Sequence, residues 1–155
     1  MKILIIILAS FILLVMVALI ILSLMSQSGQ ANGLVEAKLT KCPDTPNCLC
    51  SEYKSDVDHY VEPLVISEQR ATEVLSRLKT VILRMGGSIN VEKADYLAAT
   101  FTSSIFRFVD DLEIRVVPDK NRVQLRSASR VGHGDGGVNR KRIERLKSIY
   151  NLEAD

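Results

Sequence analysis

Glycines and cations stand together in residues 126–146, RSASRVGHGDGGVNRKRIERL, and this combination of residue types can bind an anion. A glycine-rich loop can turn successive backbone N–H groups inward, and a helix N-terminus adds free donors of its own. Arg140, Lys141 and Arg142 fall in the first turn of the expected helix, where each cation opposes the helix dipole by about 0.3 to 1 kcal/mol. A bound anion would offset that repulsion. The predicted anion-binding residues are Arg126, Arg130, Gly132, Gly134, Gly136, Gly137, Asn139 and Arg140.

This loop does not have the pattern of a nucleotide-phosphate loop. No Gly-Lys-Ser or Gly-Lys-Thr follows it, and the strand before it belongs to an expected antiparallel meander, not to a βαβ unit. A structural interpretation competes with anion binding. In that interpretation the glycines reverse the chain, Asp135 neutralises the cations locally, and the basic side chains project into solvent.

A second chemistry is suggested by three aspartates. Asp110 shares the apolar phase of its strand, so its carboxylate should point toward the core, and a buried carboxylate must be paired, hydrogen-bonded, metal-bound or protonated. Ser127 and Ser129, in the same phase on the next strand, are the expected hydroxyl partners. The alternative is a metal-assisted hydrolase in which Asp110, Asp111, Asp135 and a histidine are the ligands.

The other face of the same two strands carries alternating charges. If residues 118–121 form a four-residue hairpin loop, Glu113 lies opposite Arg126, and Asp111 has Arg126 and Arg130 as diagonal neighbours. We expect this ladder to be a surface network of ion pairs that fixes the register. Each exposed pair would contribute about 0.2 to 1 kcal/mol.

The segment CPDTPNCLC holds the three cysteines of the chain. Cys42 and Cys48 enclose five residues, two of them proline, and outside the cytoplasm a disulfide between them is the expected outcome. Cys50 is then left as a free thiol. A C-x5-C-x-C spacing is not a usual zinc pattern, and His59 and His133 are the only histidines. No cofactor is therefore expected.

The N-terminus predicts a membrane anchor. Residues 3–25 are 23 positions of apolar side chains interrupted by two serines, long enough for a helix to cross the ~30 Å hydrocarbon core and to make the lipid bilayer a partner. A cleavable signal peptide has a shorter apolar region, of roughly 7 to 15 residues, and remains the alternative. Lys2 precedes the span and the next cation is Lys38, so the remainder of the chain should face out of the cytoplasm.

The chain therefore divides into three parts. Residues 1–25 are the expected signal-anchor, the small polar residues 26–33 a flexible tether, and residues 34–155 an extracytoplasmic domain. We expect a single-pass protein of the cytoplasmic (inner) membrane, with its domain in the periplasm if the cell is Gram-negative. The net charge of +2 provides no global field for nucleic acid, so no nucleic-acid partner is expected. The sequence does not identify a protein partner.

The domain should be α+β. Ser67 is a plausible N-cap and Glu68 suits the first turn of a helix that ends at Gly86, and a second helix should cover residues 139–150. The apolar face of the first helix consists of Ala71, Val74, Leu75, Leu78, Val81, Ile82 and Met85. Strands are expected at 88–93, 96–103, 106–117 and 121–130, with a short one possible at 59–65. These elements predict two layers, an antiparallel meander of about four to five strands covered by two helices.

Three stretches, CPDTPNCLCS, FRFVDDLEIR and RSASRVGHGDGGVNRKRI, resemble in order and spacing the motifs of the domain of unknown function 1499 (DUF1499) family. The resemblance covers roughly residues 41–148. It implies a bacterial envelope or plastid protein, often with an N-terminal span or signal, and it implies no established activity. The chain departs from the family pattern at Leu49 and Cys50, where valine and serine are usual.

Three functions remain in competition at this point. The first is a membrane-anchored domain that binds the phosphate, sulfate or carboxylate of a lipid, glycan or small molecule, and we prefer it. The second is the metal-assisted hydrolase, and the third is a purely structural envelope protein. The first predicts basic residues that converge on an open cleft, the second predicts carboxylates within reach of one metal, and the third predicts saturated ion pairs without a pocket.

Overall fold

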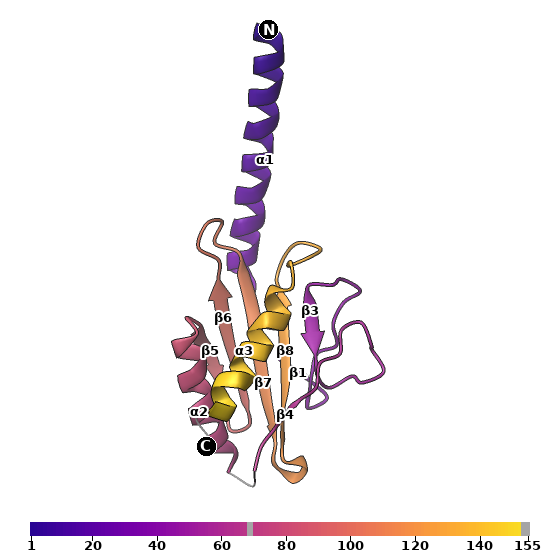
Figure 1. Cartoon of the computed structure of the whole chain (residues 1–155), viewed down its shortest axis with the longest axis vertical. Coiled ribbons are helices and arrows are strands. Elements are labelled where there is room, and N and C mark those ends of the chain that lie inside the picture. The colour runs from indigo at the N-terminus through magenta and orange to yellow at the C-terminus, as the bar shows by residue number, and fades with distance from the viewer. Residues whose placement is uncertain (68–69, 153–155) are drawn as a thin grey trace.

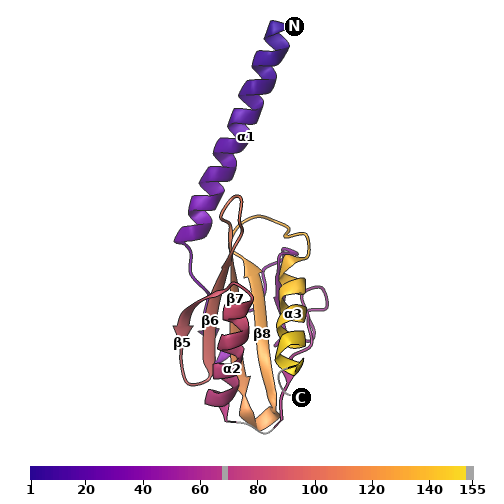
Figure 2. The same ribbon diagram turned by 60° about the vertical axis from the view of Figure 1, so that its left-hand side comes forward.

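A six-stranded sheet, mostly antiparallel, forms the centre of the domain in the computed structural model, which describes residues 1–67 and 70–152 (Figure 1). Two helices cover one face of this sheet, and a third helix leaves the domain at one end (Figures 1 and 2). The α+β class with one N-terminal apolar helix is confirmed. The sheet is slightly larger than the expected meander of four to five strands.

The helices are α1 (Lys2–Ser28), α2 (Ala71–Arg84) and α3 (Val138–Leu152), with a 3₁₀ turn η1 (Pro118–Lys120). The strands are β1 (Leu34–Val35), β2 (Lys38–Leu39), β3 (Cys48–Cys50), β4 (Leu64–Val65), β5 (Ser88–Glu92), β6 (Tyr96–Thr102), β7 (Val109–Val117) and β8 (Arg122–Ser129). The main sheet has the order β3-β8-β7-β6-β5, and β4 also pairs with β8. β1 and β2 form a separate two-stranded ribbon.

The β7–β8 hairpin has the expected register. Val117 pairs with Arg122 and Asp110 with Ser129, so Glu113 lies opposite Arg126. β7 begins only at Val109, because the backbone at Arg107 has a positive φ of 59° and leaves the extended conformation. The residues before Val109, which we expected in the strand, instead form the tip of the β6–β7 hairpin.

The helix α2 confirms the apolar face and corrects its start. Val74, Leu78 and Ile82 are fully buried against the sheet, as the spacing predicts. The helix begins at Ala71 with Arg70 in the N-cap position, so the prediction of Ser67 as the N-cap is wrong, and Glu68 lies outside the described residues. The helix N-terminus has instead an ion pair between Arg70 and Glu73. Gly86 follows the helix with φ +87°, the left-handed conformation expected at its end.

Both faces of the central strands are covered, which the sequence pattern does not predict. The larger core lies between the sheet and the helices α2 and α3. On the outer face, the chain segment before β4 covers the sheet with a second, smaller core. It consists of Leu39, Cys42, Cys48, Cys50, Tyr96, Ala98 and Ala128. The charged ladder of β7 and β8 therefore lies beneath protein and not in solvent.

The helix α1 is long and apolar enough to cross a membrane, by length and composition. It continues through Ser28, so the first three residues of the expected tether are helical. Its last turns contact the sheet. The Ser26 hydroxyl accepts a hydrogen bond from the Val109 N–H at 2.7 Å and lies 3.3 Å from the Val109 carbonyl oxygen, to which it donates.

Candidate functional site

The centre of the outer face is a buried ion pair. Arg126 Nη1 donates to Glu113 Oε2 at 2.8 Å, and the two residues are 4% and 0% exposed. Glu113 also accepts hydrogen bonds from the Tyr96 hydroxyl at 2.7 Å and from the Gly33 N–H at 2.8 Å. Burial, and then the bond to Glu113, raise the pKa of Tyr96 well above its usual range, so this hydroxyl stays a donor. Glu113 thus joins β6, β7, β8 and the N-terminal segment.

A second ion pair lies nearer to α1. Arg130 donates from Nε and Nη2 to the two oxygens of Asp111, both at 2.8 Å, in a bidentate arrangement. Its Nη1 donates to the Ser26 carbonyl oxygen at 3.1 Å, which links the pair to the end of α1. The prediction of a solvent-exposed ladder is wrong, because residues 26–33 and the disulfide loop cover it.

A pocket of about 430 Å³ opens beside these two ion pairs. Four segments form its wall: the end of α1 with the residues that follow it, the disulfide loop, Asp111 of β7, and the end of β8 with Arg130. The polar and charged lining residues are Gln30, Asn32, Lys41, Asn47, Asp111, Arg126, Ser129 and Arg130. A neighbouring pocket of about 560 Å³ shares Arg130 and adds the cations Lys93 and Arg107.

Arg126 is the unusual residue of this pocket. A guanidinium has five N–H donors, and its Nε is buried without a hydrogen-bond partner among the described residues. An unmade hydrogen bond at a buried donor costs about 1 to 3 kcal/mol, so such a donor calls for an explanation. Arg126 lines the pocket with other atoms of its side chain, whereas Nε itself has almost no accessible surface.

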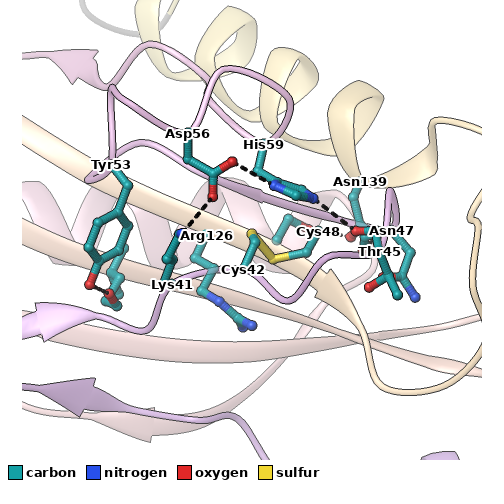
Figure 3. The surroundings of a disulfide bond; sticks show 12 residues. Lys41, Cys42, Thr45, Asn47, Cys48, Tyr53, Asp56, His59, Arg126 and Asn139 are labelled. Carbon is teal, nitrogen blue, oxygen red and sulfur yellow. Dashed lines mark hydrogen bonds and ion pairs between the residues drawn. A yellow bond between two sulfur atoms is a disulfide. The ribbon is translucent and has the colours of Figure 1, made fainter.

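The disulfide loop, one of the segments that line the pocket, contains the predicted disulfide. Cys42 and Cys48 are bonded, and Lys41 beside them approaches Asp56 to 3.8 Å (Figure 3). His59 contacts the same aspartate through Nδ1 at 2.8 Å, which places the histidine in a structural network (Figure 3). Cys50 is free and buried, and burial raises the pKa of its thiol to about 11. This thiol is therefore a poor nucleophile at neutral pH.

The inner face of the sheet has a polar cluster of its own. Asp110 pairs with Arg142 at 2.6 Å, so the expected serine partners are wrong and an arginine neutralises this carboxylate. The Arg142 guanidinium also stacks over the Phe101 ring, 4.7 Å from its centroid. Asn139 is 1% exposed, and its side-chain oxygen accepts from the Ser127 hydroxyl at 2.6 Å.

The glycine loop differs from the expected anion site. The helix N-terminus already has an internal carboxylate, because Asp135 Oδ1 accepts from the Gly137 N–H at 2.9 Å and Oδ2 from the Asn139 N–H at 2.7 Å. Gly132, Gly136 and Gly137 have positive φ and reverse the chain. This geometry supports the competing structural interpretation for the loop.

The eight predicted anion-binding residues do not meet in one place. Arg126 and Arg130 line the pocket on the outer face, Asn139 is buried on the inner face, and Arg140 is exposed on α3. Gly132 and Gly134 border a different, apolar pocket. The structure brings only the two arginines of the set to the pocket beside the disulfide.

The Asp135 carboxylate leads to a stability prediction. Burial opposes its ionisation, but the N–H groups of Asn139 and Gly137 outweigh it and hold the pKa of Asp135 below its ordinary value. A lowered folded-state pKa gives stability that is present above the unfolded value and is lost as pH falls through the folded one. We expect Asp135→Ala to lower the free energy of unfolding by about 0.5 to 2 kcal/mol at pH 7.

The measurement is urea unfolding of both chains from pH 7 down to about pH 3, across the ordinary aspartate pKa. The difference between wild type and Asp135→Ala should shrink toward the acid end. Arg140→Gln, a change in the same turn that leaves the carboxylate in place, is the control. A difference that does not depend on pH would contradict a role for the charged carboxylate.

The metal alternative finds little support in the geometry. Among residues 1–67 and 70–152, no group of three or more His, Cys, Asp or Glu side chains could hold a metal ion. Asp110 and Asp111 lie on opposite faces of β7, since successive side chains of a strand alternate. Each of them is already paired with an arginine.

Sequence reasoning missed several residues of the pocket. Lys41 and Asn47 flank the cysteines, and their part in a site was not predicted because the disulfide loop lies far from β8 in sequence. The pairing of β3 with β8 brings them there, with Cys48 opposite Ala128. The Asn47 side chain donates to the Gly132 carbonyl oxygen at 2.8 Å. A short apolar CLC run beside two prolines was the available signal for this edge strand.

The comparisons with known proteins give one result. The model of a family described as "Protein of unknown function (DUF1499)" matches residues 38–149 of the chain. The matched region extends from β2 into α3 and includes the disulfide loop, both ion pairs and the glycine loop. A search of the curated proteins gave no match.

Proposed function

The chain belongs to the DUF1499 family, for which no function is established, and from this premise we propose that it is a membrane-anchored domain that binds an anionic group. The binding site is the pocket between the end of α1, the disulfide loop and β8. The ligand group is the phosphate, sulfate or carboxylate of a lipid, glycan or small molecule. The observation that carries the proposal is the pair of guanidiniums at the pocket wall, Arg126 and Arg130, which Glu113 and Asp111 hold in place.

Three cations line the pocket, and each of them has a carboxylate partner within the fold. Lys41, Arg126 and Arg130 line it, whereas Asp111 is its one acidic lining residue among those described. Glu113 and Asp111 hold the two guanidiniums in fixed orientations, so little side-chain entropy is lost when a ligand binds. The amide side chains of Gln30, Asn32 and Asn47 supply further donors.

The alternatives have less support. A purely structural protein predicts that every buried polar group finds a partner within the fold, and Arg126 Nε departs from this pattern. A metal-assisted hydrolase needs carboxylates that converge, whereas Asp110, Asp111 and Asp135 each have separate partners. Anion binding is the function that uses the pocket as it is built.

The anchor is the second part of the proposal. We infer that α1 is retained, because Ser26 exchanges hydrogen bonds with the backbone of β7 and Arg130 donates to the Ser26 carbonyl oxygen. Cleavage of a signal sequence near Ser28 would remove these contacts. The Cys42–Cys48 disulfide favours an oxidising compartment, so we place the domain outside the cytoplasm of a single-pass protein of the cytoplasmic (inner) membrane.

Inorganic phosphate is the probe that tests the site. We expect phosphate to raise the melting temperature of the full chain in neutral detergent, saturably, and more than chloride at matched ionic strength. At ten times Kd the stabilisation should be about 1.4 kcal/mol, the mass-action value for a ligand of the folded state. The measurement is a thermal melt at increasing phosphate concentration.

Two variants that each replace a cation by an uncharged side chain distinguish binding in the pocket from binding at the glycine loop. Lys41→Gln removes an exposed cation of the pocket and should weaken the saturable response several-fold, while Arg140→Gln should leave it unchanged. Stabilisation by ion exclusion is not saturable and would not depend on Lys41. Loss of the response in Arg140→Gln alone would place the anion at the glycine loop. No saturable response in wild type would contradict anion binding.

A further inference from the structure

The end of the domain from which α1 leaves carries two loops beside the helix. The β6–β7 hairpin and the β8–α3 loop both reach past the point where α1 ends (Figures 1 and 2). Leu22 of α1 lines an apolar pocket of about 240 Å³ together with Phe108, Val131 and Val138 from these loops and from the start of α3. Leu22 belongs to the apolar run 3–25, so the loops extend to the level of the last turn of the candidate span.

The tip of the β6–β7 hairpin is apolar and exposed. Ile105 is 81% exposed, and the rings of Phe106 and Phe108 lie 5.9 Å apart beside it. The hairpin is well defined, because the Ser103 N–H donates to the Phe108 carbonyl oxygen and the Phe108 N–H to the Ser103 hydroxyl. Removing an isoleucine side chain from water contributes about 1.5 to 3 kcal/mol, so this tip gains from an apolar environment.

Exposed cations lie at the same end of the domain as the apolar tip. Arg107 follows Phe106, and Arg140 and Lys141 lie in the first turn of α3, at the same end of the domain (Figure 1). Asp135 accepts hydrogen bonds from the α3 backbone and Asp110 is ion-paired with Arg142, so both carboxylates already have partners within the fold. Each cation near an anionic lipid surface contributes about 1 kcal/mol to membrane binding. This attraction equals or exceeds the repulsion between that cation and the helix dipole. A membrane surface therefore accounts for cations at the start of α3.

We propose that the tip of the β6–β7 hairpin and the first turn of α3 form a second contact with the bilayer that α1 crosses. Ile105 and Phe106 lie in the interfacial layer, and Arg107, Arg140 and Lys141 contact anionic lipid headgroups. The inference rests on the proposed membrane anchor. Its consequence is that the domain is held in a fixed orientation, with the anion pocket beside Met25 and Gly29 at the membrane surface.

The chain contains no tryptophan, so one introduced indole reports on its own site. Three variants of the full chain are compared in phosphatidylcholine–phosphatidylglycerol vesicles whose acyl chains carry bromine, a quencher of indole fluorescence. Ile105→Trp reports on the hairpin tip. Val65→Trp is the matched control, because Val65 is 75% exposed but lies in β4, toward the end of the domain far from α1 (Figure 1). Phe11→Trp reports on the middle of α1.

We expect Ile105→Trp and Phe11→Trp to lose most of their emission in brominated vesicles, and Val65→Trp to lose none. Quenching of Phe11→Trp without quenching of Ile105→Trp would overturn the second contact and leave the anchor intact. An unquenched Phe11→Trp would show that α1 is not in the bilayer, and both proposals would fall. Equal quenching of Val65→Trp and Ile105→Trp would also overturn the proposal, because the contact would not be specific to the hairpin end.

Discussion

Glu113→Gln should lower the free energy of unfolding by about 3 to 5 kcal/mol, because it leaves the Arg126 charge buried without a counter-charge. The glutamate accepts hydrogen bonds from Arg126, Tyr96 and Gly33. A glutamine side chain has one acceptor oxygen, and its NH₂ group would face at least one of these three donors. The expected loss is measured by urea unfolding of the full chain in neutral detergent, followed by tyrosine fluorescence.

An exposed pair provides the matched control. Lys79 and Glu92 form an ion pair with side chains 40% and 49% exposed, so Glu92→Gln should change the free energy of unfolding by less than about 1 kcal/mol. The double variant Glu113→Gln/Arg126→Gln tests the mechanism, since it removes the unpaired charge and should recover part of the stability. Equal effects of Glu113→Gln and Glu92→Gln would contradict the buried charge network.

The hairpin at the centre of the sheet was predictable because its signals are local. Alternating apolar positions in residues 109–117 and 122–129, joined by a short turn, determine both the strands and the pairing of Glu113 with Arg126. The apolar face of α2 follows from helical spacing in the same way. These elements need no information from distant parts of the chain.

The burial of the outer face was not predictable, because it depends on contacts between distant segments. Residues 26–50 fold over β7 and β8 and convert an expected surface ladder into a buried network. The wrong partner for Asp110 has a similar cause. Arg142 is separated from it by 32 residues, and only the packing of α3 on the inner face brings the two side chains together. Periodicity indicates which way a side chain points but does not identify what covers it.

The residues predicted to bind an anion are spread over two faces of the sheet for a related reason. The basic cluster is contiguous in sequence, yet strand alternation sends Arg126 and Arg130 to the outer face, while the polar partners of Asn139 lie on the inner one. Asp135 has the role expected of an external anion at the helix N-terminus. Of the eight predicted residues, Arg126 and Arg130 line the pocket, together with residues of the disulfide loop.

The disulfide should be necessary both for the stability of the domain and for the proposed binding of phosphate in this pocket. Cys42→Ala/Cys48→Ala should lower the free energy of unfolding by about 2 to 3 kcal/mol, because the cross-link restricts the unfolded chain even across a short loop. The loop also positions Asn47, whose carbonyl oxygen accepts from the Ser129 N–H at 3.0 Å and from the Asn139 side chain at 2.9 Å. Loosening it should therefore weaken the saturable phosphate response as well.

Cys50→Ala is the control that distinguishes the loss of the cross-link from the replacement of a buried cysteine side chain. Cys50 is buried in the same small core, but it is a free thiol and does not line the pocket, so its replacement should preserve the phosphate response. A thiol reductant should reproduce the double-variant phenotype in wild type and in Cys50→Ala, and should have no further effect on Cys42→Ala/Cys48→Ala. If the reductant changes neither stability nor phosphate binding in wild type, the pocket does not depend on the disulfide. The wall formed by residues 41–48 would then be held by β3 pairing, the Asn47 contacts and the contacts of Lys41 and Thr45 with Asp56 and His59.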